Sequence, residues 1–438
     1  MSNLLEKYVI TGGQRLTGNV HVSGAKNSVL KLMAAALLTN DEVTLTNVPA
    51  LSDVAVMNAV LASLGRKTEH SSGSLTILAG SCTTTEAPYE LVSKMRASFD
   101  VLGALLGKYG EAQVPLPGGC SIGKRGVDQH IKGLEALGAE LTMEHGTIHA
   151  KASQLQGCSI TLDMPSVGAT ENILLASVLA QGVTTLFNAA QEPEIADLCH
   201  FLNALGANIQ GMGSSQLVIT GVSPHQLHGT TYSVLPDRIE AATFLLASVA
   251  TGGDVVVERM RLNDLAMPVE KLMAMGGIIT DLGSGRVRIQ GPSEQRLKAT
   301  SYVTSFYPSF PTDLQSPFMA VLSVAEGVSM ISETIYENRF KHVGELIRMG
   351  ATIQVQNDVA IVTGVERLSG ASVKAHDLRA GAAMVLAGMM AEGESQVFNL
   401  NHIDRGYECF HEKLVSLGAS IIRTPLSDKE HAPVLGIL

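Results

Sequence analysis

Residues 159–220 read SITLDMPSVGATENILLASVLAQGVTTLFNAAQEPEIADLCHFLNALGANIQGMGSSQLVIT, and this stretch decides the fold. Alternating polar and apolar residues at Ser159–Asp163 and Val183–Asn188 predict strands. Longer apolar runs at Thr170–Ala180 and Ile195–Leu205 predict helices. Two more alternating stretches then predict a hairpin. The predicted order is therefore strand, helix, strand, helix, strand, strand.

The same pattern occurs six times, at a spacing of about seventy residues. In each copy the first helix ends at Asn40, Gly110, Gly182, Gly252, Gly327 or Gly393. The second helix ends at Gly65, Gly138, Gly206, Gly276, Gly350 or Gly418, where a left-handed residue suits a helix C-terminus. A unit of this length can bury much of its own core. We therefore expect an α/β protein with two domains of three units each.

Composition excludes several classes of protein. The longest apolar runs, such as Ala241–Ala250, are too short to cross a bilayer, and Glu6 and Lys7 interrupt the N-terminus before any signal-peptide core. A net charge of −10 without a basic run argues against nucleic-acid binding. The five cysteines show neither paired nor zinc-binding spacing. We expect a cytoplasmic protein with no metal and no membrane insertion.

One residue in each copy lies fourteen positions before the first turn and so falls in the first turn of a helix. These residues are Lys26, Arg96, Gly168, Arg238, Asp313 and Arg379. The first turn has unpaired N–H groups and the positive end of the helix dipole, which favour anions over cations. Four cations at such positions suggest a site for an anionic ligand.

Individual members of this set have simpler explanations. Lys26, followed by Asn27, is suited to bind phosphate or carboxylate, although a solvated lysine is the alternative. Asp313 is a candidate general base kept ionised by the cations, or simply a helix cap. Arg339 and Arg405 follow strands at a matching phase, so they face the same cleft or form surface ion pairs.

The segment Val114–Gly126 is the most reactive-looking part of the chain. Its two prolines and four glycines around Cys120 predict a loop. Lys124 and Arg125 are expected to lower the pKa of this thiol, which favours a role as nucleophile or proton donor. The alternative is that Cys120 is a small buried hydrophobe. For the other four cysteines this alternative is preferred.

Eight ordered motifs together resemble the UDP-N-acetylglucosamine 1-carboxyvinyltransferases, a group of enolpyruvyl transferases. The motifs are Ser23–Asn27, Met95–Ser98, Leu116–Gly123, Ser166–Thr170, Leu235–Arg238, Phe310–Asp313, Glu337–Phe340 and His402–Glu408. The resemblance is collinear from about Val9 to about Ile422. A set of eight ordered motifs is far more specific than any one of them.

The resemblance implies two inverse α/β barrels, each of three βαβαββ units. It places residues 26–235 in one domain and residues 1–25 with 236–438 in the other. It also implies that phosphoenolpyruvate and UDP-N-acetylglucosamine give the 3-O-enolpyruvyl ether and phosphate, by addition and elimination. This is the first committed step of peptidoglycan synthesis, and thus of cell wall biogenesis, cell shape and cell division. No metal or organic cofactor is implied.

The resemblance also implies roles for particular residues. Lys26, Arg125 and Arg405 hold the phosphate and carboxylate of phosphoenolpyruvate, with Asn27 and Arg96 assisting. Cys120 supplies a proton to the forming methyl group, and Asp313 takes the proton of the sugar 3-hydroxyl. The residues that match the nucleotide-binding stretches are Arg125, Gly126, Val127, Asp128, Gln129, Ser166, Val167 and Ile335. Catalysis is thus assigned to Cys120, Asp313, Lys26 and Arg405.

The sequence departs from the usual family pattern at Gly126, Ala104 and Cys409, and its tail after Arg423 is longer. These changes affect loop stiffness and surface charge more than chemistry. Two other functions are weighed against the transferase. One is transfer of enolpyruvate to shikimate 3-phosphate, by a sister enzyme that lacks the cysteine loop. The other is a catalytically silent sensor of UDP-sugars.

Overall fold

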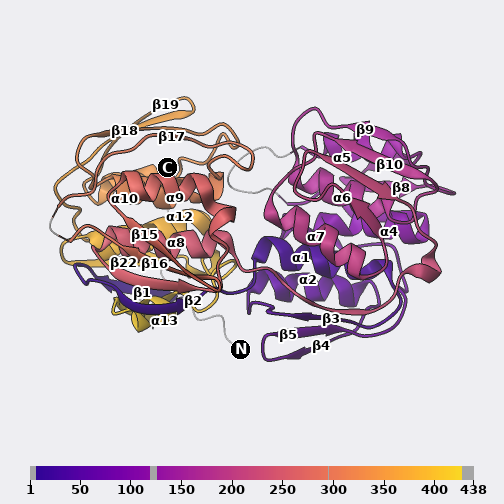
Figure 1. Ribbon diagram of the computed structural model, residues 1–438, viewed down its shortest axis with the longest axis horizontal. Coiled ribbons are helices and arrows are strands. Elements are labelled where there is room, and N and C mark those ends of the chain that lie inside the picture. Colours follow the sequence, from indigo (N-terminus) through magenta and orange to yellow (C-terminus); the bar gives the residue numbers. More distant parts are fainter. Residues whose placement is uncertain (1–5, 119–125, 294, 427–438) are drawn as a thin grey trace.

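The computed structural model of this chain describes residues 6–118, 126–293 and 295–426. These residues form two lobes that lie side by side (Figure 1). Cys120 and Arg125, singled out by the sequence, lie outside the described residues. No described helix is both long and apolar enough to span a bilayer.

The first lobe contains the elements from α1 to β13. They are α1 (Lys26–Ala35), η1 (Ala36–Leu38), β3 (Val43–Thr46), α2 (Ser52–Ser63), β4 (Thr68–Ser71), β5 (Ser74–Ile77), α3 (Tyr89–Val92), η2 (Arg96–Asp100), α4 (Val101–Tyr109), β6 (Glu111–Pro115), α5 (Asp128–Ala136), β7 (Glu140–Glu144), β8 (Thr147–Lys151), β9 (Ser159–Thr161), α6 (Val167–Ser177), β10 (Val183–Phe187), α7 (Pro193–Ala204), β11 (Asn208–Gln210), β12 (Gln216–Thr220), η3 (Pro224–Gln226) and β13 (Thr230–Ser233).

The second lobe joins the N-terminal strands to the C-terminal half of the chain. Its elements are β1 (Glu6–Thr11), β2 (Thr17–His21), α8 (Arg238–Ala250), β14 (Asp254–Glu258), η4 (Leu262–Leu265), α9 (Ala266–Ala274), β15 (Ile278–Gly283), β16 (Arg286–Gln290), β17 (Tyr302–Val303), η5 (Thr312–Leu314), α10 (Gln315–Leu322), β18 (Val328–Ser332), α11 (Val343–Arg348), β19 (Thr352–Gln356), β20 (Val359–Thr363), β21 (Ser372–Lys374), α12 (Leu378–Met390), β22 (Glu394–Phe398), η6 (Leu400–His402), α13 (Phe410–Ser416) and β23 (Ser420–Pro425).

The repeated unit is confirmed. Strands β9 to β12 form a sheet in the order β11-β12-β10-β9, in which β9 and β10 are parallel and the other pairs antiparallel. Strands β17 to β20 repeat this order. Helix α6 begins three residues earlier than the apolar run, because the Ser166 side chain accepts the N–H of Ala169 at 3.4 Å. All six glycines that end the second helices have φ between +92° and +107°.

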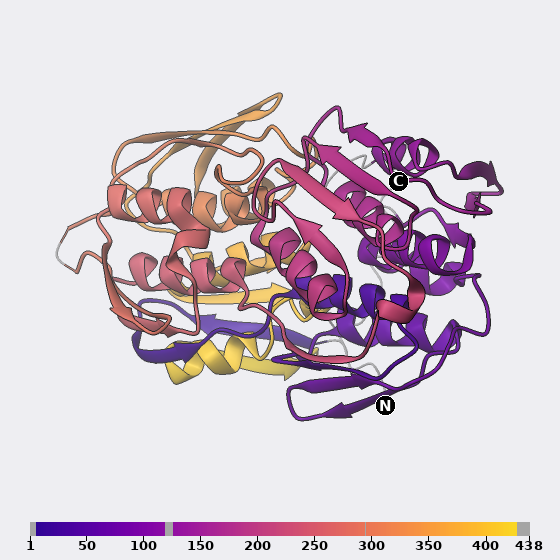
Figure 2. The same cartoon turned by 45° about the vertical axis from the view of Figure 1, so that its right-hand side comes forward.

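The remaining sheets depart from the simple repeat at the places where the chain connects distant units. Strand β13 pairs in parallel with β3, and β2 pairs in parallel with β14. Each thus takes the place that β9, the first strand of its unit, has beside β10. In the second unit an isolated parallel bridge between Glu86 and Gln113 stands in this position. Strand β1 pairs with both β22 and β23, so the first and last described strands share one sheet of the second lobe (Figures 1 and 2).

Each lobe has its own core, and some helices lie inside it while others, such as α9 and α13, bury only two residues each. Helices α8 and α12 are almost entirely buried, and α8, α10 and α12 contact one another within the second lobe (Figure 1). One core runs from Val29 to Val234, and the other combines Tyr8–Val22 with Ile239–Ile421. These cores support, as a proposal, a division of the chain at residues 25/26 and 235/236.

A charged cluster interrupts the apolar core of the first lobe. Lys31 Nζ lies 2.5 Å from Glu171 Oε2 and 3.1 Å from Asp100 Oδ2, and all three side chains are buried. Burial raises the pKa of Glu171 to about 8, although Lys31 opposes this shift. A buried carboxylate that loses its cation is strongly destabilising.

We expect Lys31→Met to lower the free energy of unfolding by about 3 kcal/mol, measured by urea denaturation. Protonation of Glu171 moderates the loss, because a neutral carboxyl group costs less to bury than a charged one. Lys132→Met is the control, since Lys132 pairs with Asp163 at the surface and should contribute little. Equal unfolding free energies for the two variants would contradict this account.

Candidate active site

The first predicted site residues meet where the two lobes touch. Lys26, in the first turn of α1, places Nζ 2.9 Å from Asp53 Oδ2. Arg405 comes from the other lobe, after η6, and places Nε 2.8 Å from Asp53 Oδ1. The structure therefore brings Lys26 and Arg405 together through a carboxylate.

Asp53 is not among the site residues predicted from the sequence. It lies in the first turn of α2, directly after Ser52, where an acidic residue is the ordinary helix-start signal. Its partner Arg405 is 352 residues away in sequence. Sequence spacing within one repeat could not reveal such a contact.

Asp313 lies in η5 between two arginines of its own lobe. Its Oδ1 lies 2.9 Å from Arg339 Nη2, and its Oδ2 lies 2.8 Å from Arg379 Nη2. Burial alone would raise the pKa of Asp313, but Arg379 and Arg339 outweigh it and hold this pKa well below its usual range. The N-cap of η5 is Pro311, which has no side chain that could cap the helix, and Asp313 is the acidic residue of the first turn. Asp313 therefore lies at a helix start and also forms two ion pairs.

The two groups of charges influence each other. Burial lowers the pKa of Lys26, Asp53 raises it, and Arg379 and Arg405 lower it further. Lys26 in turn helps to lower the pKa of Asp313. These residues therefore form one electrostatic unit across the junction between the lobes.

Two other cations of the predicted set have separate partners. Arg238 Nε lies 3.1 Å from Glu194 Oε1, across the same junction, and its guanidinium lies 5.6 Å from the Tyr307 ring centroid. Arg96 Nη2 donates to the carbonyl of Gly126 at 2.9 Å. Carboxylates on neighbouring elements thus explain why Arg238 and Arg379 are stable at helix starts.

Arg96 nevertheless lies near the central group. Arg405 Nη2 donates to the carbonyl of Lys94, two residues before Arg96, at 3.2 Å. Asn27 is partly buried beside Lys26 in the first turn of α1. The structure therefore gathers Lys26, Asn27 and Arg405, with the Arg96 turn next to them.

The predicted nucleotide residues lie on two parts of the first lobe and one part of the second. Gln129, at the start of α5, donates from Nε2 to Asp163 Oδ2 at 2.8 Å. Ser166 caps α6, and Val167 follows it as the first residue of that helix. Gly126, Val127 and Asp128 directly precede or begin α5, with Gly126 and Asp128 exposed.

Ile335 lies near Asp313 because one glutamate binds the turns that carry both. Glu333 Oε1 accepts the N–H of Ile335 at 2.9 Å. Its Oε2 accepts the hydroxyl of Thr312, next to Asp313, at 2.9 Å. Ile335 thus lies near the part of the candidate site that contains Asp313.

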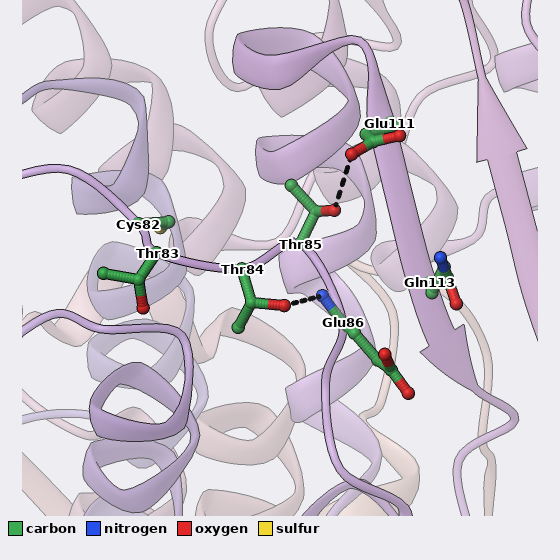
Figure 3. Close-up of a pocket in the computed structure, with 7 residues that line it drawn as sticks. All are labelled: Cys82, Thr83, Thr84, Thr85, Glu86, Glu111 and Gln113. Carbon is green, nitrogen blue, oxygen red and sulfur yellow. Dashed lines mark hydrogen bonds between the residues drawn. The ribbon is translucent and has the colours of Figure 1, made fainter.

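A surface pocket of about 360 Å³ lies elsewhere, between residues 82–86 and strand β6 of the first lobe (Figure 3). Its lining is mostly polar: Cys82, Thr83, Thr84, Thr85, Glu86, Glu111 and Gln113. The hydroxyl of Thr85 contacts Glu111 Oε1 at 3.3 Å (Figure 3). None of the predicted site residues that the structure describes lines this pocket.

The chain resembles known proteins along almost its whole length. Residues 10–414 match the family described as EPSP synthase (3-phosphoshikimate 1-carboxyvinyltransferase). UDP-N-acetylglucosamine 1-carboxyvinyltransferase 2 of Carboxydothermus hydrogenoformans is 51% identical over 420 residues, which are 96% of this chain and 99% of that protein. UDP-N-acetylglucosamine 1-carboxyvinyltransferase of Gluconobacter oxydans is 51% identical over 421 residues, with the same shares covered.

Solved structures show the same architecture. The enolpyruvyl transferase NikO from Streptomyces tendae superposes with a TM-score of 0.87 at 27% identity, over 97% of this chain and 100% of that one. EPSP synthase from Acinetobacter baumannii superposes with a TM-score of 0.73 at 20% identity, over 96% and 100%. The second likeness concerns the fold alone.

Proposed function

This chain belongs to the EPSP synthase family, and we propose that within it the chain is a UDP-N-acetylglucosamine 1-carboxyvinyltransferase. It transfers the enolpyruvyl group of phosphoenolpyruvate to the 3-hydroxyl of UDP-N-acetylglucosamine and releases phosphate. This is the first committed step of peptidoglycan synthesis, which we place in the cytoplasm. The observation that carries the proposal is about 50% identity, over nearly full length, to relatives with this name.

The cations at the junction are suited to bind phosphoenolpyruvate. Lys26 and Arg405 face one another from opposite lobes, and both bind the same carboxylate. An anionic substrate offers them the same kind of oxygen atoms. We assign the phosphate and carboxylate of the substrate to Lys26, Arg405 and Arg125, with Asn27 and Arg96 assisting. Fixed cations stabilise charge that develops during the addition.

The reaction needs one acid and one base. The sugar 3-oxygen bonds to C2 of phosphoenolpyruvate while C3 takes a proton, which gives a tetrahedral intermediate. Loss of that methyl proton and of phosphate then restores the double bond. We assign the proton donor to Cys120 and the acceptor of the hydroxyl proton to Asp313.

We assign the nucleotide to the starts of helices α5 and α6 in the first lobe. Gly126 and Val127 directly precede α5, which Asp128 and Gln129 begin, while Ser166 caps α6 and Val167 begins it. The free N–H groups of a helix start suit the diphosphate. Ile335 completes this set from the second lobe, because Glu333 binds both its turn and the turn that carries Asp313.

Phosphate release from phosphoenolpyruvate tests the function directly. We expect release with UDP-N-acetylglucosamine and none with shikimate 3-phosphate or without an acceptor. Release only with shikimate 3-phosphate would favour the sister activity. No release with either acceptor, together with binding of the UDP-sugar, would favour the sensor and overturn the proposal.

A further inference from the structure

Asp53 lies at the centre of the junction, although none of the roles assigned above includes it. Its side chain is only 3% exposed, and its two oxygens bind cations from different lobes. We propose that Asp53 is a positioning residue that joins Lys26 and Arg405 into one receptor for the substrate anion. This inference rests on the proposed function, since it takes the anion to be phosphoenolpyruvate.

A simple helix-start role does not account for Asp53. In the part of the chain that the structure describes, no backbone N–H of α2 donates to the Asp53 carboxylate. Instead, Lys26 Nζ lies 2.9 Å from one oxygen and Arg405 Nε lies 2.8 Å from the other. A first-turn acid stabilises a helix by dipole alone, without needing two cations from other elements.

The segment before Asp53 is also fixed to the segment that carries Arg405. The N–H of Ser52 donates to the carbonyl of Asp404 at 3.4 Å. The N–H of Ala50 donates to Glu408 Oε1 at 2.7 Å. The start of α2 is therefore attached to residues 404–408 by backbone and side chain. This attachment fixes the place of Asp53 relative to Arg405.

Lys26 depends on Asp53 for its charge. Arg405 and Arg379 act on Lys26 as like charges, and burial also disfavours its charged form. Asp313 attracts it from η5, and Asp237, the N-cap of α8, accepts its backbone N–H at 3.1 Å. Asp53 alone forms an ion pair with its ammonium group among the described residues. Without that carboxylate, the ammonium group would lose its proton more readily.

Competitive acetylation with trace acetic anhydride measures this effect without turnover, because only the neutral amine reacts. Lys26 and the surface residue Lys132 are followed by peptide mass spectrometry across a pH series. We expect Asp53→Asn to move the midpoint for Lys26 down by about one pH unit or more, and to leave Lys132 unchanged. Asp53→Glu should stay near wild type, because it keeps the charge.

The matched control is Asp254→Asn, which removes a carboxylate from a surface pair with Arg288, 2.6 Å away. This variant should leave the Lys26 midpoint unchanged. Arg405→Gln removes the second cation that binds Asp53, and it provides a separate test of the Lys26 midpoint if Asp53→Asn does not fold. It removes a like charge, so the Lys26 midpoint should rise.

Steady-state kinetics then link the charge to the reaction. For Asp53→Asn, we expect the alkaline limb of kcat/KM for phosphoenolpyruvate to move down with the Lys26 midpoint, and KM for phosphoenolpyruvate to rise about tenfold at pH 8. An unchanged Lys26 midpoint in Asp53→Asn, or an unchanged midpoint in Arg405→Gln, would overturn the inference. Inactive wild-type protein would refute only the proposed function, because acetylation still reports the pairing.

Discussion

Cys120→Ala is expected to lower kcat about a thousandfold and to abolish inactivation by a small epoxide shaped like phosphoenolpyruvate. The proton that makes the methyl group has no donor in this variant, and the epoxide has no thiolate to open it. Steady-state turnover and intact-protein mass after treatment measure the two effects. Mass should rise by one adduct in wild type and not in the variant.

Cys120→Asp separates the two roles of the thiol. A carboxylic acid can also donate a proton, and some members of the resembled family carry Asp at this position. We therefore expect this variant to keep much of the turnover while resisting the epoxide. Full activity of Cys120→Ala would remove Cys120 from the chemistry.

The other cysteines provide the control for this experiment. Burial raises the pKa of Cys158, of Cys199 to about 12, and of Cys409, where Glu412 and Glu408 add to the effect. These thiols should therefore react slowly. Cys82 is partly exposed, so Cys82→Ala is the matched variant and should be inactivated as fast as wild type. If Cys82→Ala resisted the epoxide, the adduct would lie on Cys82 and not on Cys120.

The repeated fold could be predicted from sequence because its signals are local. A glycine at the end of each second helix marks the period, and all six have the left-handed backbone that this position favours. The exchange of β1, β2 and β13 between units could not be predicted in this way. Pairing between strands that are far apart in the sequence produces no recognisable residue spacing within a single unit.

The charged residues of the candidate site could also be predicted only in part from the sequence. Lys26 and Asp313 stand out because of their phase in the repeat, and in the structure Lys26 binds Asp53 and helps to lower the pKa of Asp313. Arg238 has the same phase but binds Glu194 across the junction instead. Asp53 has no distinguishing phase, although it binds Lys26 and Arg405. Which carboxylate pairs with which cation depends on the approach of the two lobes, not on either unit.

Asp313→Asn is expected to lower kcat about a thousandfold, and this variant tests whether Asp313 is a base or an orienting group. Asparagine keeps the size and an oxygen that can accept from Arg379. It cannot accept the proton of the sugar hydroxyl. Loss of the negative charge leaves Arg339 and Arg379 less neutralised, so KM for phosphoenolpyruvate should not rise. The kcat and KM values from initial rates measure both effects.

The ion pairs with Arg339 and Arg379 weaken Asp313 as a base. With both oxygens bound to guanidinium groups, the pKa of Asp313 lies far below the range of an effective base. The sugar hydroxyl must therefore replace at least one of these contacts before the proton moves. If Asp313 only orients the sugar, asparagine should do so nearly as well, and kcat should stay within about tenfold of wild type. Asp254→Asn, which removes a surface carboxylate, should leave both constants unchanged. A thousandfold loss in kcat without a rise in KM would then identify Asp313 as the group that accepts the proton.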